Sequence, residues 1–234
     1  MSSRIPSLGI LDHEIVECRL CPRLAAYREE VGRIRRRAYR DQTYWSRPVP
    51  GFGDPAARLL IIGLAPAAHG GNRTGRMFTG DRSGDYLYRA LWEAGFANQP
   101  TSVDRNDSLR LQDAYITAPV RCAPPDNKPT LQEIQTCRPY LVRELALLPN
   151  VKLVVVLGGI ALNAYLSILQ DGGYIAARAP FRFAHGAAYT THPGSPLVLA
   201  SYHPSQQNTS TKRLTAEMLA EIFHRARRLI DQSQ

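Results

Sequence analysis

The sequence lacks the features that direct a chain into or across a membrane. None of its apolar runs approaches the roughly 18 residues that a bilayer-spanning helix needs. Its first residues, M-S-S-R-I-P-S-L-G-I, contain no continuous apolar segment of the kind found in a secretory signal peptide. We therefore expect a cytoplasmic protein without a membrane partner.

Lysine is scarce, although the chain is strongly basic. Of the 29 basic residues, 26 are arginine, and against 20 acidic residues they give a net charge of +9. A basic surface favours polyanions, because each cationic contact with a phosphate releases counterions. Arginine suits this contact, since its planar group offers several N–H donors at once. The charge alone favours neither a protein that binds nucleic acid nor a basic protein that does not.

Cysteine is also rare, with only Cys18, Cys21, Cys122 and Cys137. Disulfides are unusual in the cytoplasm, which leaves metal binding, redox chemistry or plain burial. Cys18 and Cys21 form a C-x2-C pair that lets two thiolates face one metal, and a four-thiolate site leaves no cysteine over. Zinc and a [4Fe–4S] cluster both accept four cysteines, and spacing does not separate them. The alternative is four independent buried or surface thiols.

Four short apolar runs, bounded by Gly or Pro, alternate with segments of helical character. Such runs, rich in β-branched residues, are typical of buried parallel strands. Their alternation with helices predicts an α/β sandwich with a parallel sheet, in a single domain. The predicted strands are 58–62, 114–117, 152–157 and 197–202, and the predicted helices are 85–94, 131–148, 160–170 and 216–231.

The N-terminal segment, about 1–50, has two further features. Residues 11–31 predict a helix that carries the C-x2-C pair, with Pro22 disturbing its register. Residues 33–40, R-I-R-R-R-A-Y-R, form a basic run with Tyr44 and Trp45 close behind it. This run is either a solvated arm or a segment that contacts phosphates.

Polar, Gly and Pro residues collect directly after the predicted strands. The loop after the first strand, 63–81, is rich in glycine but matches neither a P-loop nor a G-x-G-x-x-G dinucleotide motif. In open α/β sheets, ligands bind outside the carboxyl ends of the strands. We therefore expect the site at this edge, with His69, Arg73 and Arg76 available to meet phosphates.

Three residues of these loops are candidates for chemistry, and each has a structural alternative. Phe78 could stack on a base or belong to the core. Asp81 could stabilise a cationic sugar or orient water, or it could cap the helix that follows. His203 could donate a hydrogen bond to a developing anion, or it could be a satisfied histidine in a turn.

The motifs G-L-A-P-A-A-H-G-G-N-R-T-G-R-M-F-T-G-D and H-P-S-Q-Q-N-T, together with the four cysteines, resemble the uracil-DNA glycosylase superfamily. More narrowly, they resemble its family 5, the iron–sulfur type B enzymes, from about Cys18 to Leu214. The resemblance implies a three-layer α/β/α sandwich with a central four-stranded parallel sheet, and a [4Fe–4S] cluster held by the four cysteines. It also implies a monofunctional enzyme that flips uracil and other deaminated or modified bases, such as hypoxanthine, out of DNA and excises them hydrolytically.

The resemblance also assigns roles to single residues. Phe78 would stack on the extruded base, and His203 would stabilise the leaving base as an anion. Asp81 and Asn208 would assist at the sugar or hold the water, which makes Asp81, His203 and Asn208 the catalytic candidates. The residues expected to bind the substrate are Gly63, Leu64, Ala65, Pro66, Ala67, His69, Gly70, Asn72, Phe78, Ala118, Pro204 and Ser205.

Three positions depart from what the resemblance leads us to expect. Ala65 stands where better-known members carry an Asp or Asn that activates water, so Asp81 is the nearest acidic candidate for that task. Ala118 stands where tightly selective members carry an asparagine that reads the base edge, which predicts a broader range of bases. Lys212 stands where glycine is expected. A lysine there is expected to meet a phosphate, and it leaves Schiff-base lyase chemistry open.

The partners implied are double-stranded DNA and, as a further candidate, single-stranded DNA containing uracil or hypoxanthine, bound by a nucleoid-associated monomer. Two interpretations from other classes stay open. One is a metal-stabilised nucleic-acid-binding module without catalysis. The other is a zinc-bearing hydrolase of free nucleotides, although the H-x-E…P-C-x-x-C signature of zinc deaminases is absent.

Overall fold

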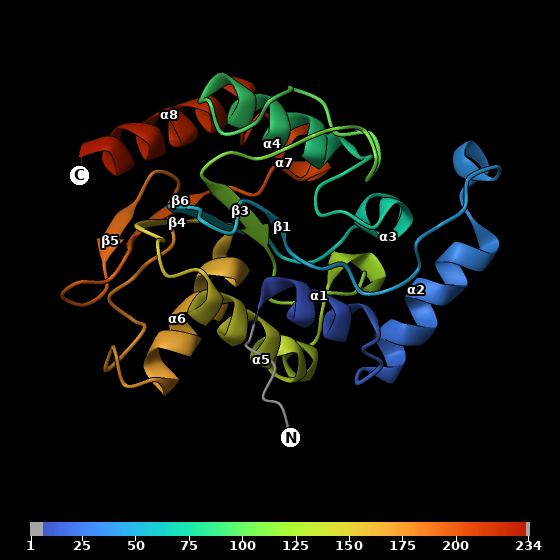
Figure 1. The fold of residues 1–234 in the computed structure, drawn as a ribbon, viewed down its shortest axis with the longest axis horizontal. Coiled ribbons are helices and arrows are strands. Elements are labelled where there is room, and N and C mark those ends of the chain that lie inside the picture. The colour runs from blue at the N-terminus through green and yellow to red at the C-terminus, as the bar shows by residue number, and fades with distance from the viewer. Residues whose placement is uncertain (1–6, 233–234) are drawn as a thin grey trace.

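The computed structural model describes residues 7–232, in which a six-stranded sheet lies between two layers of helices (Figure 1). Its four central strands are parallel and the two edge strands are antiparallel to their neighbours. Across the sheet the strands are β1 (Phe52–Gly53), β3 (Ala114–Thr117), β2 (Leu59–Ile62), β4 (Leu153–Leu157), β6 (Leu197–Ser201) and β5 (Ala188–Thr190). The predicted sandwich and its four parallel strands are confirmed. The edge strands were not predicted, because two or three residues make no apolar pattern.

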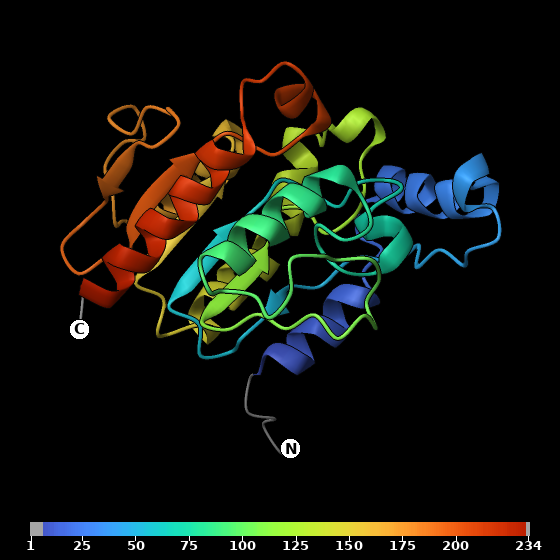
Figure 2. The same cartoon turned by 90° about the horizontal axis from the view of Figure 1, so that it is seen from above.

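The two helical layers cover opposite faces of the sheet, as two perpendicular views show (Figure 2). Alternate residues of each strand point into different layers: Leu59 and Ile61 pack with one set of helices, and Leu60 and Ile62 with the other. All four are fully buried, which is why the strand appears in the sequence as a continuous apolar run. The helices are α4 (Arg82–Glu93) and α8 (Ala216–Gln232) on one face, and α1 (Leu8–Val16), α5 (Leu131–Leu147) and α6 (Gly159–Asp171) on the other.

The single helix predicted over 11–31 is wrong, because the segment forms two helices. The first is α1, and the second is α2 (Pro22–Ile34), which begins directly after Cys21. Proline has no N–H to donate and would clash inside a helix, but it fits the first position of one. Pro22 therefore starts α2, and the C-x2-C pair lies in the connection between the helices.

Short helices shape the loops between these elements. Three of them lie in loops that follow β2, β3 and β6, and a fourth follows α2. None of the described helices is long and apolar enough to cross a membrane. The short helices are η1 (Arg37–Tyr39), α3 (Gly71–Thr74), η2 (Pro125–Asn127) and α7 (Gln206–Ser210).

Candidate active site

A cavity of about 350 Å³ opens at the carboxyl end of the parallel sheet. Its walls come from the loop after β2, the start of α4, the end of η2 and the loop after β6. This is the edge at which the sequence predicts the site. The expected residues that line the cavity are Leu64, Ala65, Ala67, Phe78, Asp81, His203 and Ser205.

Phe78 forms one wall in a backbone conformation that L residues rarely adopt, with a φ of 52°. Its ring lies against Gly63, where an added Cβ would stand 2.7 Å from Phe78 Cε2, so only glycine leaves room for the ring. The centroid of the same ring is 5.6 Å from that of His203, with the planes tilted by 33°. Such a backbone conformation persists only when its surroundings impose it.

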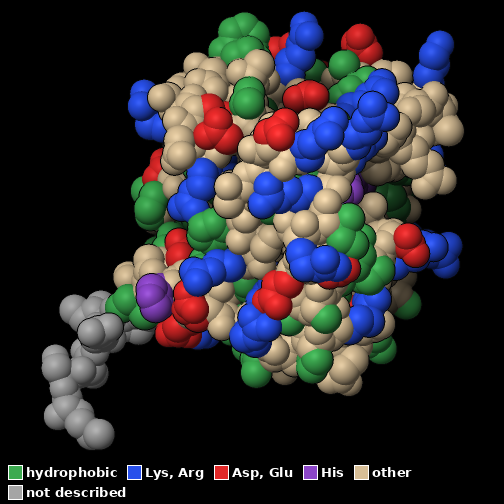
Figure 3. All heavy atoms as spheres, turned by 90° about the vertical axis from the view of Figure 1, so that its right-hand side faces the viewer, with side chains coloured by type: hydrophobic (Ala, Val, Ile, Leu, Met, Phe, Trp, Pro, Cys, Tyr) green, Lys and Arg blue, Asp and Glu red, His purple; other side chains and the backbone are tan. Residues whose placement is uncertain are grey.

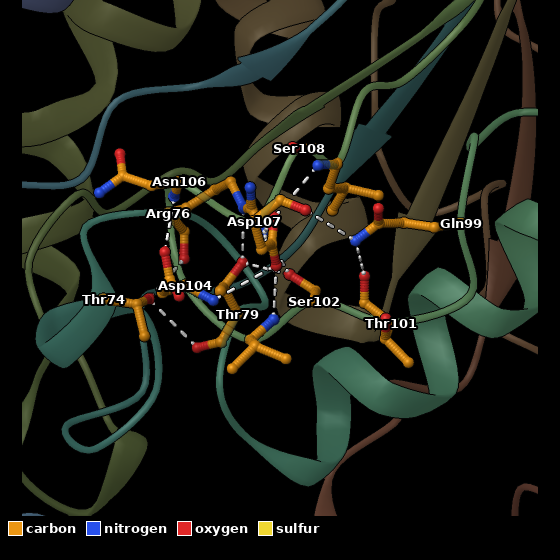
Figure 4. A network of polar contacts seen from close by, with 12 residues as sticks. Thr74, Arg76, Thr79, Gln99, Thr101, Ser102, Asp104, Asn106, Asp107 and Ser108 are labelled. Atoms are coloured by element: carbon orange, nitrogen blue, oxygen red, sulfur yellow. Dashed lines mark hydrogen bonds and ion pairs between the residues drawn. The ribbon is translucent and has the colours of Figure 1, made fainter.

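A buried polar network holds the residues on either side of Phe78 in the chain, and we attribute that constraint to it (Figure 4). Arg76 Nη2 lies 2.8 Å from each carboxylate oxygen of Asp107 and donates to Ser102 Oγ at 2.9 Å. Arg76 Nε donates to Thr79 Oγ1 at 2.9 Å, and the hydroxyls of Thr79 and Ser102 are 2.6 Å apart. Burial raises the pKa of Asp107, but the hydrogen bonds from Arg76 and nearby backbone N–H groups leave it below its usual value. The network therefore fixes the loop through a charged pair.

The interpretation of Arg73 and Arg76 as phosphate contacts is wrong, because both side chains are buried and donate hydrogen bonds inside the protein. Arg73 Nε donates to the carbonyl oxygen of His69 at 2.8 Å, and Nη2 to that of Gly80 at 2.6 Å. Its Nη1 donates to Gln42 Oε1 at 2.5 Å. The two arginines brace the loop from within.

Asp81 is both the N-cap of α4 and a cavity residue. Its Oδ1 accepts a hydrogen bond from the backbone N–H of Gly84 at 3.0 Å. Its Oδ2 lies so close to Gly70 that a Cβ there would collide with it. Burial raises the pKa of Asp81, and hydrogen bonds from the backbone of Gly84 and Ser83 offset part of that effect. The cap predicted from the sequence is confirmed, and it leaves a carboxylate at the cavity.

His203 lies beside Phe78, directly after β6. Burial lowers its pKa to about 4, so the imidazole is neutral near pH 7 and has one N–H donor and one acceptor nitrogen. Asn208 does not line the cavity. Its Nδ2 donates to the backbone oxygen of His203 at 2.9 Å, so its side chain holds the turn that presents the histidine. Ser205, also on this turn, accepts from the backbone N–H of Asn208 at 3.3 Å as the N-cap of α7.

The other expected substrate-binding residues do not line the cavity. His69 Nδ1 is 3.0 Å from Tyr44 Oη, a bond that ties the loop to the segment after η1. Roles at the substrate for this group stay predictions. Its buried members are Gly63, Pro66, Gly70, Asn72, Ala118 and Pro204.

With this geometry in view, the comparison with known protein families decides what the chain is. The family model of the uracil DNA glycosylase superfamily matches residues 50–227. The chain belongs to the uracil-DNA glycosylase superfamily. The resemblance found in the sequence motifs is therefore confirmed.

Relatives in this superfamily match nearly the whole chain. The type-5 uracil-DNA glycosylase of Thermus thermophilus is 55% identical over 215 residues, which cover 92% of this chain and 94% of the relative. That of Mycobacterium leprae is 52% identical over 230 residues, 98% of each chain. The type-4 uracil-DNA glycosylase of Thermotoga maritima is 31% identical over 190 residues, 78% of this chain and 82% of its own. The similarity is thus greater to the type-5 members.

Four cavity residues of this glycosylase fold were not singled out from the sequence: Arg82, Ser83, Asn127 and Gln206. Of these, Asn127 is the most informative, because it reaches the cavity from the loop after β3. Asp126 and Asn127 have φ values of 53° and 56°, in the left-handed region that Asn and Asp tolerate better than most residues. The D-N pair, which follows two prolines in the loop after β3, was the sequence signal that could have identified Asn127 as a cavity residue.

The four cysteines come together in a second, much smaller cavity, although they belong to three separate segments. Cys18 and Cys21 precede α2, Cys122 follows β3, and Cys137 lies within α5. All four are free thiols. Burial raises the pKa of Cys122 to about 11 and that of Cys137 to about 12, so thiolates at these positions require a strongly positive partner. Among residues 7–232, no three His, Cys, Asp or Glu side chains are placed to hold a metal ion as they stand.

Proposed function

We propose that this member of the uracil-DNA glycosylase superfamily excises uracil from DNA, together with hypoxanthine and related deaminated bases. The observation that carries the proposal is the convergence of Phe78, Asp81 and His203 on one cavity at the carboxyl end of the sheet. A nucleic-acid-binding module without catalysis would not require an aromatic ring, a half-buried carboxylate and a neutral imidazole in one place.

Each of these groups fits one step of excision from a flipped nucleotide. Extrusion costs a few kcal/mol, least for a mispaired base, and the Phe78 ring offers a face on which any base can stack. The imidazole of His203 is neutral near pH 7. Its N–H donates a hydrogen bond to the negative charge that grows on the leaving base. The carboxylate of Asp81 stabilises the positive charge on the sugar.

The water-holding group is a separate question, because Ala65 lines the cavity where other members carry a polar side chain. Asp81 lies on the same cavity and is the acidic group available there. The exposed carboxamide of Asn127 also lines it, whereas Asn208 is engaged with the backbone of His203. We assign water activation to Asp81, with Asn127 as the amide that orients the water.

A broad range of bases follows from the missing amide at Ala118. A site that hydrogen-bonds a base edge rejects bases without the matching edge, because its buried polar group would then be unpaired. Ala118 is fully buried and offers no such group. Stacking and shape then select the base, and these discriminate weakly among deaminated bases.

The surface that would carry DNA is basic beside the N-terminal helices. Lys and Arg side chains are spread over the face that includes the end of α2 and η1, interspersed with Asp and Glu (Figure 3). Arg36, Arg37 and Arg40 of the basic run are exposed there. We favour phosphate contact over a free arm for this run, with the protein acting as a monomer on DNA in the cytoplasm.

The set of cysteines supports our proposal of a [4Fe–4S] cluster, held by Cys18, Cys21, Cys122 and Cys137. Four cysteine sulfurs form the full ligand set of such a cluster, and all four line the second, smaller cavity. Two buried guanidiniums, those of Arg28 and Arg121, also line it and suit an anionic centre. A cluster with four protein ligands offers no open position, so we assign it a structural role in bracing the loops beside it.

Base excision from end-labelled duplexes tests the proposal, with uracil or hypoxanthine placed opposite each normal base. Strand breaks that appear only after alkali, for both bases, are the expected result of a broad monofunctional glycosylase. Breaks without alkali would instead indicate lyase chemistry. No breaks at all from folded, iron-loaded protein would overturn the enzyme in favour of a binding module.

A further inference from the structure

Arg28 occupies an unusual position on α2, because its guanidinium is buried against sulfur. The residue is 2% exposed. Its Nη1 donates to Cys122 Sγ at 2.9 Å, and its Nη2 donates to the backbone oxygen of Cys18 at 3.2 Å. The side chain therefore joins two of the three segments that carry the cysteines.

A comparison with the second buried arginine shows what Arg28 lacks. Arg121 forms an ion pair with the fully buried carboxylate of Glu144. For Arg28, the carboxylate in reach is Glu29, 3.7 Å from Nη2 and partly exposed. Both guanidiniums keep nitrogens without a partner among the described residues, so the missing buried carboxylate is what sets Arg28 apart. A buried charge is costly unless it is paired. An anionic centre formed by the cysteines would supply the missing counter-charge.

The backbone of Arg28 is tied to the active-site loop. Asn72 is fully buried in α3, and its Nδ2 donates to the carbonyl oxygen of Arg28 at 3.2 Å. Asn72 belongs to the same loop as Gly70, which packs directly against the carboxylate of Asp81. In addition, Ala65 of the active-site cavity packs on the small cluster formed with Cys122 and Leu24. Thus α2 contacts the cysteines with a side chain and the active-site loop with its backbone.

From this arrangement we infer that Arg28 is a positioning residue. Its guanidinium balances the charge of the cysteine centre and donates a hydrogen bond to one ligand sulfur. By doing so it keeps α2 packed against the cysteine centre. The hydrogen bond from Asn72 to the Arg28 backbone then fixes the loop that carries Asp81 relative to α2. The inference rests on the proposed iron–sulfur cluster, and it adds a residue through which the cluster supports the active site.

The test measures how firmly the protein holds its iron, without using excision as the readout. Arg28→Gln removes the charge, Arg28→Lys keeps it but loses the planar fork, and Arg33→Gln is a matched control on the exposed side of α2. Iron content and the rate at which a chelator bleaches the visible absorbance are measured on each purified protein. Loss of an outer partner of a metal ligand typically weakens binding about 10–100-fold, so bleaching of Arg28→Gln should accelerate by that factor. Arg28→Lys should lie between Arg28→Gln and the wild type, and Arg33→Gln should match the wild type.

A second variant follows the link onward to the active site. Asn72→Ala should keep its iron and its visible spectrum but show a fall of about tenfold or more in single-turnover excision of uracil, because small misplacements of catalytic groups are costly. Equal iron retention by Arg28→Gln and the wild type would overturn the role of Arg28 and leave the cluster standing. Wild-type excision by Asn72→Ala would overturn the link to the loop. Wild-type protein that excises uracil but contains no iron would overturn the cluster and the inference together, and leave the glycosylase activity intact.

Discussion

The loop 63–81 has a front, which lines the cavity, and a back, which is buried in the protein. Polar groups on the front are left available, whereas those on the back are paired. On the front, Phe78 and Asp81 line an open cavity, with His203 facing them from the loop after β6. On the back, Nε and Nη2 of Arg76 are directed at partners, and the pair with Asp107 is nearly buried. Catalytic side chains need hydrogen-bonding capacity that is left for the substrate. They keep their positions only if the side chains that support them are fully hydrogen-bonded. The comparison predicts that front variants lose rate and back variants lose stability first.

The largest effect is expected at the front, from Asp81→Asn. Asparagine is as good an N-cap as aspartate, so the hydrogen bond from the Gly84 N–H is kept while the negative charge is lost. Single-turnover excision of uracil should fall by about 10²–10⁴-fold, with little change in the melting temperature. Asp85→Asn, in the exposed first turn of the same helix, removes the same charge and should excise at the wild-type rate. If both variants excise equally fast, Asp81 has no catalytic role.

At the back, Arg76→Met should act on stability. Removing one partner of a buried ion pair typically costs roughly 3–5 kcal/mol, because the other charge is left unpaired. Denaturant unfolding should detect this loss of free energy of unfolding. The comparison variant is Arg89→Gln, which breaks the exposed Arg89–Glu93 pair and should cost less than about 1 kcal/mol. Equal losses in the two variants would show that the Arg76 network does not brace the loop.

How much of the fold and of the candidate site could be predicted from the sequence depends on how far apart the interacting residues lie in the chain. The parallel strands could be predicted because both of their faces are buried, which makes runs such as L-V-V-V-L continuous. The front residues of the loop could be found because they belong to one contiguous motif. The role of Arg76 could not, since its partner Asp107 is 31 positions away and no local pattern links them. The helix break at Pro22 was signalled by the proline itself, but the apolar periodicity on both sides concealed it.

The imidazole of His203 adds a dependence on pH that distinguishes the front from the back. Its pKa is about 4 in the folded protein because of burial, against an ordinary value of 6.5 when unfolded. Between these two values the unfolded chain binds a proton that the folded protein does not, so stability falls as pH falls from about 6.5 to 4. The slope due to this group is at most about 1.4 kcal/mol per pH unit. His203→Gln should flatten the profile of unfolding free energy in that window, and an unchanged slope would show that the imidazole is not buried in the neutral form.

The smallest effect is expected outside the loop 63–81, at Lys212 between α7 and α8. The resemblance leads us to expect glycine at this position. Lys212 is exposed and has a φ of 56°, which glycine adopts without the steric cost that a lysine meets. Lys212→Gly should therefore change the free energy of unfolding by less than about 1 kcal/mol. If the ammonium meets a phosphate, the slope of log affinity for DNA against log salt should fall by about one. Borohydride should trap no covalent complex with DNA in either protein, because a monofunctional enzyme forms no Schiff base. Trapping by the wild type that is lost in Lys212→Gly would instead make this lysine a nucleophile and move part of the chemistry away from the cavity.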